Sequence, residues 1–185
     1  MGDREILSQM IKETVLVPLE DEYGKTMIKL EEPGVKNSIA CIRNSPSDAF
    51  VIKADEFPAP KIFFKGDKGE CKRADFIIIS PEKKVILYVE LKAGAKDADH
   101  IIKQLKGATC VVKYCTEIGM QFWNESSFLN GYSHRFIGIV NLSVNKKTSR
   151  HKKAPVHDTP ETFFKISSPN NIQFREIAGY RYGNN

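Results

Sequence analysis

The sequence has few cysteines and no Cys-x-x-Cys pair: the four are Cys41, Cys71, Cys110 and Cys115. A domain of 185 residues needs no disulfide to be stable. Cys110 and Cys115 are five positions apart, which places them about 140° apart around a helix and not on one face. We therefore expect reduced cysteines that mostly pack, and neither a disulfide framework nor a cysteine metal site.

The chain also lacks a long hydrophobic run. Its longest apolar stretches, at 85–89 and 136–140, have the length of a β-strand, whereas a membrane-spanning helix needs about 20 such residues. Residues 1–5 carry neither the basic flank nor the apolar core of a signal peptide. These absences predict a cytoplasmic protein without a membrane partner.

Charge of neither sign dominates. Lys and Arg number 28 and Asp and Glu 23, so the formal net charge is +5, which permits a polyanionic partner without establishing one. Hydrophobic residues make up 41% and charged residues 28%, as in ordinary folded domains. With no internal repeat, low-complexity tract or linker, residues 1–185 are expected to form a single domain.

Hydrophobic periodicity predicts both helices and strands. Helical spacing occurs over 5–17, where Pro18 would end the helix, and over 98–115, where Asp97 or Asp99 is placed to cap it. Segments of strand length occur at 25–30, 38–42, 49–54, 74–80, 84–92, 135–142, 163–166 and 172–177. The order predicts an α/β domain in which helices flank a central mixed sheet, with a core that runs αβββαβ.

The segments 74–80 and 84–92 carry the chemically informative residues. If they form an antiparallel hairpin, opposed residues have numbers that sum to 165, so Asp75 faces Glu90. Lys92 is two residues beyond Glu90 and projects from the same side of the sheet. Two opposed carboxylates repel each other, and Mg²⁺ is a hard cation that would neutralise them. Lys92 could then order a water or stabilise negative charge, as hydrolysis of a phosphodiester requires.

This pattern, Asp75 followed by Glu90-Leu91-Lys92 on a hairpin before a helix, resembles the PD-(D/E)xK nuclease superfamily. That superfamily includes restriction endonucleases, Holliday-junction resolvases and phage-defence nucleases. The resemblance covers about residues 73–108 and implies a restriction-endonuclease-like core. It also implies that Asp75, Glu90 and the carbonyl of Leu91 bind Mg²⁺, with Mn²⁺ as a substitute, and that Lys92 is the catalytic lysine.

Two further residues are implied by the resemblance. Members often place a Gln or Lys on the following helix, where Gln104 fits, and some add a glutamate from the first helix, for which Glu13 is the candidate. One position departs from the family name, because Ala74 stands where the name has Pro. DNA is the expected substrate, with RNA as an alternative, and a homodimer or a partner subunit would supply recognition that so short a chain has little room to encode.

Two simpler interpretations stay open. Glu90 and Lys92 could form a surface ion pair worth a few tenths of a kcal/mol, although Ile77, Ile79, Ile86 and Tyr88 on the same face indicate burial. The domain could also be a catalytically silent nuclease-fold subunit that binds nucleic acid or a partner protein. Silent members usually lose the lysine or one acid, and this chain has all three.

The remaining features are less specific. A basic cluster could contact a nucleic-acid backbone or be a solvated loop; it consists of Lys146, Lys147, Arg150, Lys152 and Lys153. Phe122 and Trp123 follow the long helix and are expected in the core. The four histidines show no metal-ligand spacing, and the chain has no Walker loop or dinucleotide fingerprint.

Overall fold

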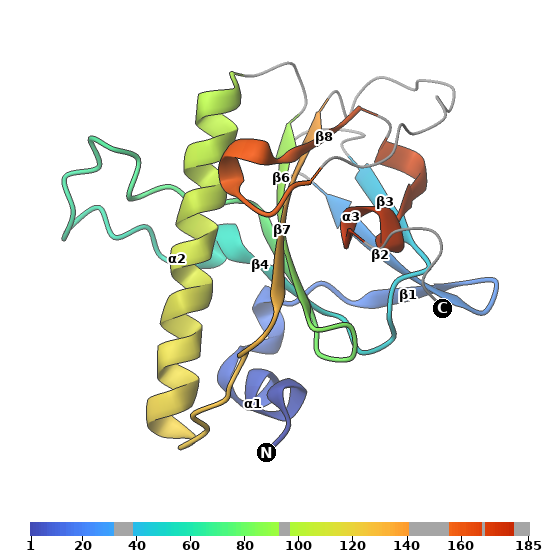
Figure 1. Cartoon of the computed structure of the whole chain (residues 1–185), viewed down its shortest axis with the longest axis horizontal. Helices are drawn as coiled ribbons and strands as arrows, with labels where there is room; N and C mark the ends of the chain where they lie inside the picture. The colour runs from blue at the N-terminus through green and yellow to red at the C-terminus, as the bar shows by residue number, and fades with distance from the viewer. Residues whose placement is uncertain (32–38, 93–96, 141–155, 168, 180–185) are drawn as a thin grey trace.

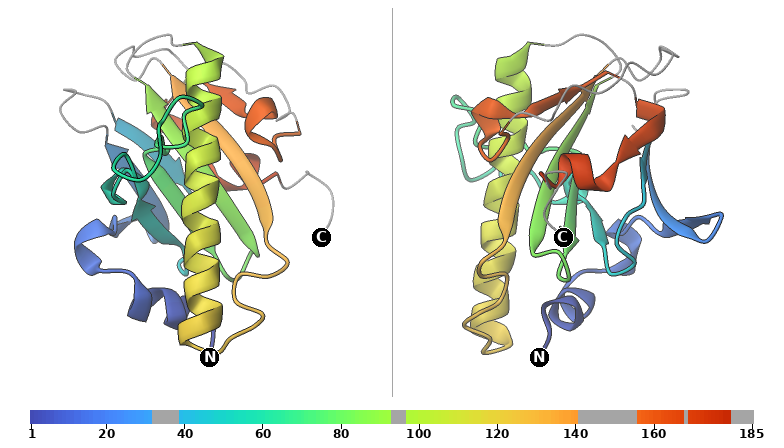
Figure 2. Two further views of the ribbon diagram at one scale, coloured as in Figure 1. Left: turned by 90° about the vertical axis from the view of Figure 1, so that its left-hand side faces the viewer. Right: turned by 45° about the vertical axis from the view of Figure 1, so that its right-hand side comes forward.

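The computed structural model describes residues 1–31, 39–92, 97–140, 156–167 and 169–179. It shows three layers, with a long helix on one side, a five-stranded sheet in the middle and a four-stranded sheet on the other side (Figures 1 and 2). The α/β class predicted from the sequence is confirmed.

The middle sheet runs in the order β4-β5-β6-β7-β8. Its strands are β4 (Phe50–Lys53), β5 (Phe76–Ser80), β6 (Val85–Lys92), β7 (Ser133–Val140) and β8 (Phe164–Ile166). The pairs from β4 to β6 are antiparallel, whereas β6, β7 and β8 are parallel to one another. All eight residues of β6 are buried, as expected for the central strand of a sheet covered on both faces.

The second sheet was not expected, because the sequence predicted only one. It runs in the order β1-β2-β3-β9, from β1 (Leu19–Glu22), β2 (Lys25–Glu31), β3 (Ile39–Arg43) and β9 (Ile172–Gln173). β1, β2 and β3 form an antiparallel meander, and β9 adds to β3 in parallel. The predicted central mixed sheet is thus present with helices on one face, but its other face is covered by this second mixed sheet, where helices were predicted.

Each face of the middle sheet has its own apolar core. One cluster lies between the sheet and two helices, α1 (Asp3–Met10) and α2 (Ala98–Phe122), and includes Ile77, Ile79 and Tyr88. The other lies between the two sheets and includes Ile78, Leu87 and Leu91. Successive residues of β5 and β6 thus point to opposite layers. The position of each charged residue along its strand therefore determines which layer its side chain faces.

Two predicted elements differ from the structure. The first helix ends at Met10, because Ile11 is extended, and a separate 3-10 turn, η1 (Glu13–Val15), follows. The segment predicted as a strand over 172–177 is the two-residue β9 followed by a short helix, α3 (Phe174–Ile177). The prediction for 98–115 is confirmed and extended, because α2 continues to Phe122 and begins after an Asp97 side chain that accepts from the Asp99 amide at 3.3 Å.

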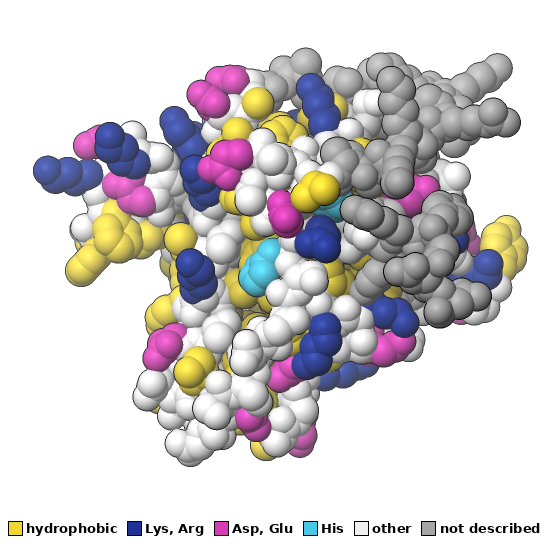
Figure 3. All heavy atoms as spheres, viewed as in Figure 1, with side chains coloured by type: hydrophobic (Ala, Val, Ile, Leu, Met, Phe, Trp, Pro, Cys, Tyr) yellow, Lys and Arg dark blue, Asp and Glu magenta, His cyan; other side chains and the backbone are white. Residues whose placement is uncertain are grey.

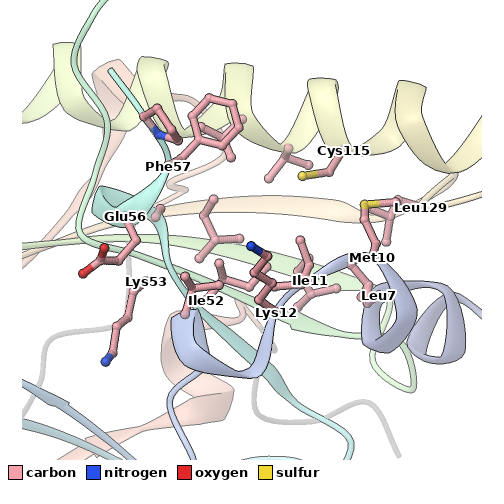
Figure 4. Close-up of a pocket in the computed structure, with 17 residues that line it drawn as sticks. Leu7, Met10, Ile11, Lys12, Ile52, Lys53, Glu56, Phe57, Cys115 and Leu129 are labelled. Carbon is pink, nitrogen blue, oxygen red and sulfur yellow. The ribbon is translucent and has the colours of Figure 1, made fainter. Parts of the chain in front are cut away.

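An apolar cavity of about 190 Å³ lies between α1, the middle sheet and α2 (Figure 4). Ile11, Ile52, Ile77 and Cys115 are among the residues that line it, and Figure 4 shows the charged ends of Lys53 and Glu56 turned away from it. Among the described residues that line it, the charged ones are Lys12, Lys53 and Glu56, and the others are apolar apart from the thiol of Cys115.

The cysteines and the aromatic residues at the end of α2 can be compared with the sequence predictions. The four cysteines form no disulfide, and Cys110 is exposed whereas the other three are half-buried. Phe122 is exposed, so its expected place in the core is wrong, while Trp123 packs partly buried against the cluster under α2. Within the described residues no helix is long and apolar enough to cross a membrane.

Candidate active site

The hairpin of β5 and β6 has the register that the sequence predicts. Phe76 pairs with Val89 and Ser80 with Val85, so opposed residues sum to 165. Asp75 directly precedes β5 and therefore stands opposite Glu90. Because these residues share a face with Ile77 and Tyr88, they project toward the layer of α2.

Asp75 is fixed by hydrogen bonds to both neighbouring strands. Its Oδ2 accepts from the Leu91 amide at 2.6 Å, and its main-chain carbonyl accepts from the amide of Ala54 at 2.8 Å. The amide and carbonyl of one residue in an antiparallel strand point to the same neighbour. The Leu91 carbonyl therefore also faces the side of the strand on which Asp75 lies, as the resemblance implies for a metal ligand.

Glu90 is the most deeply buried charged residue of the site. Its side chain is 0% exposed and forms an ion pair with Lys92, itself 7% exposed. Oε2 of Glu90 has no hydrogen-bond partner among the described residues. Burial, and then the negative charge of Asp75, raise the pKa of Glu90 to about 8, although Lys92 acts in the opposite direction. The alternative of a solvated surface ion pair is therefore wrong.

Helix α2 carries Gln104 to the edge of the same site. A β-carbon at Gly107 would lie 1.6 Å from the carbonyl oxygen of Lys72, so the glycine allows the helix to touch the backbone that leads into β5. One turn earlier, Nε2 of Gln104 donates to the Arg73 carbonyl at 3.5 Å, the long limit of a hydrogen bond. Oε1 of Gln104 is buried without a partner among the described residues.

A cleft of about 590 Å³ opens beside these residues, and we call it the basic cleft. Asp75 and Gln104 line it together with Asp55, Ala59, Lys61, Lys65, Gly66, Cys71, Lys72, Arg73 and His100. Four of the lining side chains are Lys or Arg and two are Asp. The carboxylate of Asp75 is thus reached through a cleft in which positive charge predominates.

Two of the cleft cations have local partners. Nη2 and Nε of Arg73 donate to the Asp55 carbonyl at 2.6 and 3.2 Å, and Nζ of Lys72 lies 3.2 Å from Nδ1 of His100. These contacts orient the two side chains. Burial raises the pKa of the Asp55 carboxyl, and the positive charge of Arg73 acts on that carboxyl in the opposite direction.

The structure brings together four of the residues predicted from the sequence: Asp75, Glu90, Lys92 and Gln104. Glu13 is exposed on η1 and is not among the residues that line the cleft with Asp75 and Gln104. The basic cluster of Lys146, Lys147, Arg150, Lys152 and Lys153 lies outside the described residues.

Sequence reasoning missed the basic cleft. Lys61 and Lys65 come from a loop with no periodic pattern, and only the fold places them near Asp75. Lys72 and Arg73 directly precede the Asp75 motif, and this adjacency was a signal that could have identified them.

The donor set suits a hard divalent cation. Asp75 and Glu90 supply two carboxylates, and Oε2 of Glu90 and Oε1 of Gln104 are buried oxygens without a donor in the described part of the chain. Mg²⁺ prefers oxygen ligands and keeps several waters, so two carboxylates are enough for it. In the described ranges no group of three or more His, Cys, Asp or Glu side chains gathers around one point, which argues against a site made only of such side chains.

Comparisons with protein-family models, with curated proteins and with solved structures found no match for this chain. The arguments for its function therefore come from the site itself.

Proposed function

We propose that this protein is a Mg²⁺-dependent nuclease of the PD-(D/E)xK type, with a restriction-endonuclease-like core, that cleaves DNA. The core would comprise α1, the hairpin of β5 and β6, α2 and the parallel strand β7. RNA remains the alternative substrate, and Mn²⁺ the alternative metal.

One observation carries the proposal: a fully buried glutamate stands beside a buried lysine and opposite a second carboxylate, Asp75, which lines a cleft with four cationic residues. A buried carboxylate that faces a second carboxylate is costly without a counter-charge. A single lysine offsets part of that cost, and Oε2 of Glu90 still has no hydrogen bond among the described residues. The arrangement is therefore better suited to binding a cation than to stabilising the fold.

Each residue then has a distinct role. Asp75, Glu90 and the Leu91 carbonyl would hold Mg²⁺, which supplies an activated water and positive charge against the cleaved phosphate. Lys92 lies within reach of Glu90, and its ammonium can orient the attacking water and stabilise negative charge that develops on the phosphate. Gln104 would orient the same water or the phosphate through its unpartnered Oε1 or its amide.

The basic cleft supports a nucleic acid as the substrate. Lys61, Lys65, Lys72 and Arg73 can each neutralise a phosphate, and every such contact releases a counterion. The cleft leads the phosphate backbone to Asp75, the most accessible carboxylate of the site. A nuclease of this kind would act in the cytoplasm, where the four cysteines remain reduced.

The test is direct. Purified protein is incubated with supercoiled plasmid, with a single-stranded oligonucleotide and with RNA, each in Mg²⁺, Mn²⁺ or EDTA. We expect cleavage of DNA with either metal, none in EDTA and none by Asp75→Asn. Binding of DNA without cleavage under every condition would instead indicate a silent subunit that binds nucleic acid. A protein that neither binds nor cleaves any of these substrates would exclude the nuclease and the nucleic-acid-binding subunit, and would leave the subunit that binds a partner protein.

A further inference from the structure

The segment between η2 (Ala54–Glu56) and β5 exposes apolar side chains at its tip, and we call residues 58–72 the 58–72 loop. Ile62 is fully exposed, Phe63 is 83% exposed and Phe64 is about half exposed. Single apolar residues on a protein surface are common and need no explanation, but three consecutive large ones exposed to water indicate an interaction site. Figure 3 shows hydrophobic side chains, with lysine or arginine and acidic side chains beside them, on the projection that this loop forms in Figure 1.

The loop holds this conformation through its own hydrogen bonds. At the tip, the amides of Phe63 and Phe64 donate to the Pro60 carbonyl at 3.1 and 2.9 Å. On the return, Glu70 accepts from the Gly66 amide at 2.8 Å and from the Lys68 amide at 2.9 Å. The apolar tip is therefore displayed by a pre-formed turn, which lowers the entropy lost when it contacts a ligand.

The base of the loop rests on α2. Gly69 has a φ of +92°, and a β-carbon there would lie 3.1 Å from Cδ of Lys103. Lys72 and His100 meet at 3.2 Å in the same region. These contacts connect the base of the loop to the helix that carries Gln104. The loop and the site are therefore parts of one surface.

The cations of the loop show which ligand this surface fits. Lys61 directly precedes Ile62 and Lys65 directly follows Phe64, and both lysines also line the basic cleft with Asp75. A phosphate backbone that follows these lysines to Asp75 passes beside the tip. The bases attached to that backbone then come within reach of Ile62 and of the Phe63 ring.

We propose that Ile62 and Phe63 contact unpaired bases, so that the preferred substrate is DNA that is single-stranded next to the cleaved phosphate. This inference rests on the proposed nuclease function. An aromatic face stacks on any base that is not already stacked in a duplex, without sequence preference. Fully paired DNA hides those faces, and the tip would have to unstack a base step before it could bind.

The test replaces the tip with polar residues and compares it with a matched surface aromatic. The variant is Ile62→Ser with Phe63→Ser, and the control is Phe122→Ser, a 72% exposed phenylalanine at the far end of α2. Binding is measured in EDTA on a single-stranded oligonucleotide that contains 2-aminopurine and on its fully paired duplex. Cleavage of both substrates is measured separately in Mg²⁺.

We expect the tip variant to bind the single strand roughly 5- to 100-fold more weakly, the range expected for loss of one stacked base. The 2-aminopurine signal should change when wild type binds and not when the variant binds, while the Phe122→Ser control behaves as wild type. Duplex binding should change by less than about twofold, because the lysines that contact phosphates remain. In Mg²⁺, wild type should cleave the single strand in preference to the duplex, and the tip variant should lose this preference.

Several results would overturn the proposal. Equal single-strand binding by wild type and the tip variant would show that the tip does not contact bases. Binding of wild type, but not of the variant, to anionic lipid vesicles in place of DNA would assign the tip to a membrane surface. A wild type that binds single strands through the tip yet cleaves nothing would leave the contact between the tip and unpaired bases standing and remove the nuclease function, so the two failures are distinguishable.

Discussion

Gly107 on α2 touches the backbone of Lys72: a β-carbon at Gly107 would stand 1.6 Å from the Lys72 carbonyl oxygen and 2.5 Å from its carbonyl carbon. Backbone cannot move aside as a flexible side chain can. The close approach of α2 to the backbone that leads into β5 therefore requires a residue without a β-carbon at position 107. Gln104 is one turn away on the same helix, and its place in the basic cleft follows from that spacing.

Gly107→Ala should therefore lower both stability and activity. Overpacking of this kind typically costs about 1–3 kcal/mol of the free energy of unfolding, and it would push Gln104 away from Asp75. The matched control is Gly119→Ala, which places a β-carbon 2.2 Å from the Phe128 ring at the other end of α2. Thermal melts should show both variants destabilised, whereas nuclease assays below the melting range should show cleavage reduced only in Gly107→Ala. Equal activity in the two variants would remove the positioning role of Gly107.

Lys92→Met should abolish cleavage. The substitution keeps an unbranched apolar stem but removes the ammonium, and loss of a positioned proton-transfer or charge-stabilising group typically costs 10²- to 10⁴-fold in rate. The fold should survive, because Glu90 can hold a proton once its partner is gone. Lys106→Met, which breaks the exposed ion pair with Glu161, is the control and should cleave normally. Retention of activity within a few-fold in Lys92→Met would exclude Lys92 from catalysis.

Glu90→Gln should change how stability depends on pH when chelator is present. The pKa of Glu90 is about 8 in the folded protein against 4.5 in the unfolded chain, so the folded state binds the extra proton between these values. The stability that this proton contributes is complete below about pH 4.5 and is lost as pH rises through 8. Wild type should therefore lose on the order of 2–4 kcal/mol across this range, and Glu90→Gln should not.

Melting temperatures between pH 5 and pH 8.5 measure this difference. The melting temperature of Glu90→Gln minus that of wild type should increase by several degrees as pH rises. Glu161→Gln, on the surface, should show the same pH dependence as wild type. A gap that stays constant with pH would mean that Glu90 is ionised throughout.

Mg²⁺ should stabilise the wild-type fold and not the variants of its ligands. At a concentration 10 to 100 times the dissociation constant, a bound ion adds about 1.4–2.7 kcal/mol to the free energy of unfolding. Asp75→Asn preserves an oxygen that can accept from the Leu91 amide, so loss of the metal effect would reflect charge and not a broken hydrogen bond. Asp55→Asn, on another part of the same cleft, is the control. If that variant alone abolished the stabilisation, the cation would sit by Asp55.

The hairpin register could be predicted because it depends on local information. An apolar run on each side of a short turn fixes which residues face each other, and a slip of one residue would expose a buried face. The start of α2 could also be predicted, because the Asp97 cap is a local sequence signal. Thus Asp75, Glu90 and Lys92 could be grouped from the register alone, whereas Gln104 was added because the family resemblance implies a Gln or Lys on the following helix.

The second sheet could not be predicted in the same way. β1 has only four residues, of which the middle two are exposed and the outer two half-buried, so it lacks the alternation of a strand. Three of its four side chains are acidic, and nothing in its composition favours a strand. β9 has two residues and pairs with β3, where Arg43 faces Gln173 across 130 positions of chain. Pairing over that separation depends on the packed core between the sheets and leaves no local pattern.

The tip of the 58–72 loop is held by hydrogen bonds within the loop, to the Pro60 carbonyl on one side and to the Glu70 carboxylate on the other. This tip can therefore change without altering the strand that follows, whereas the strand of Glu90 is enclosed on both faces and tolerates little. If the proposed function holds, Ile62 and Phe63 could be replaced, and the preferred substrate changed, without disturbing the strand that carries the residues proposed for hydrolysis.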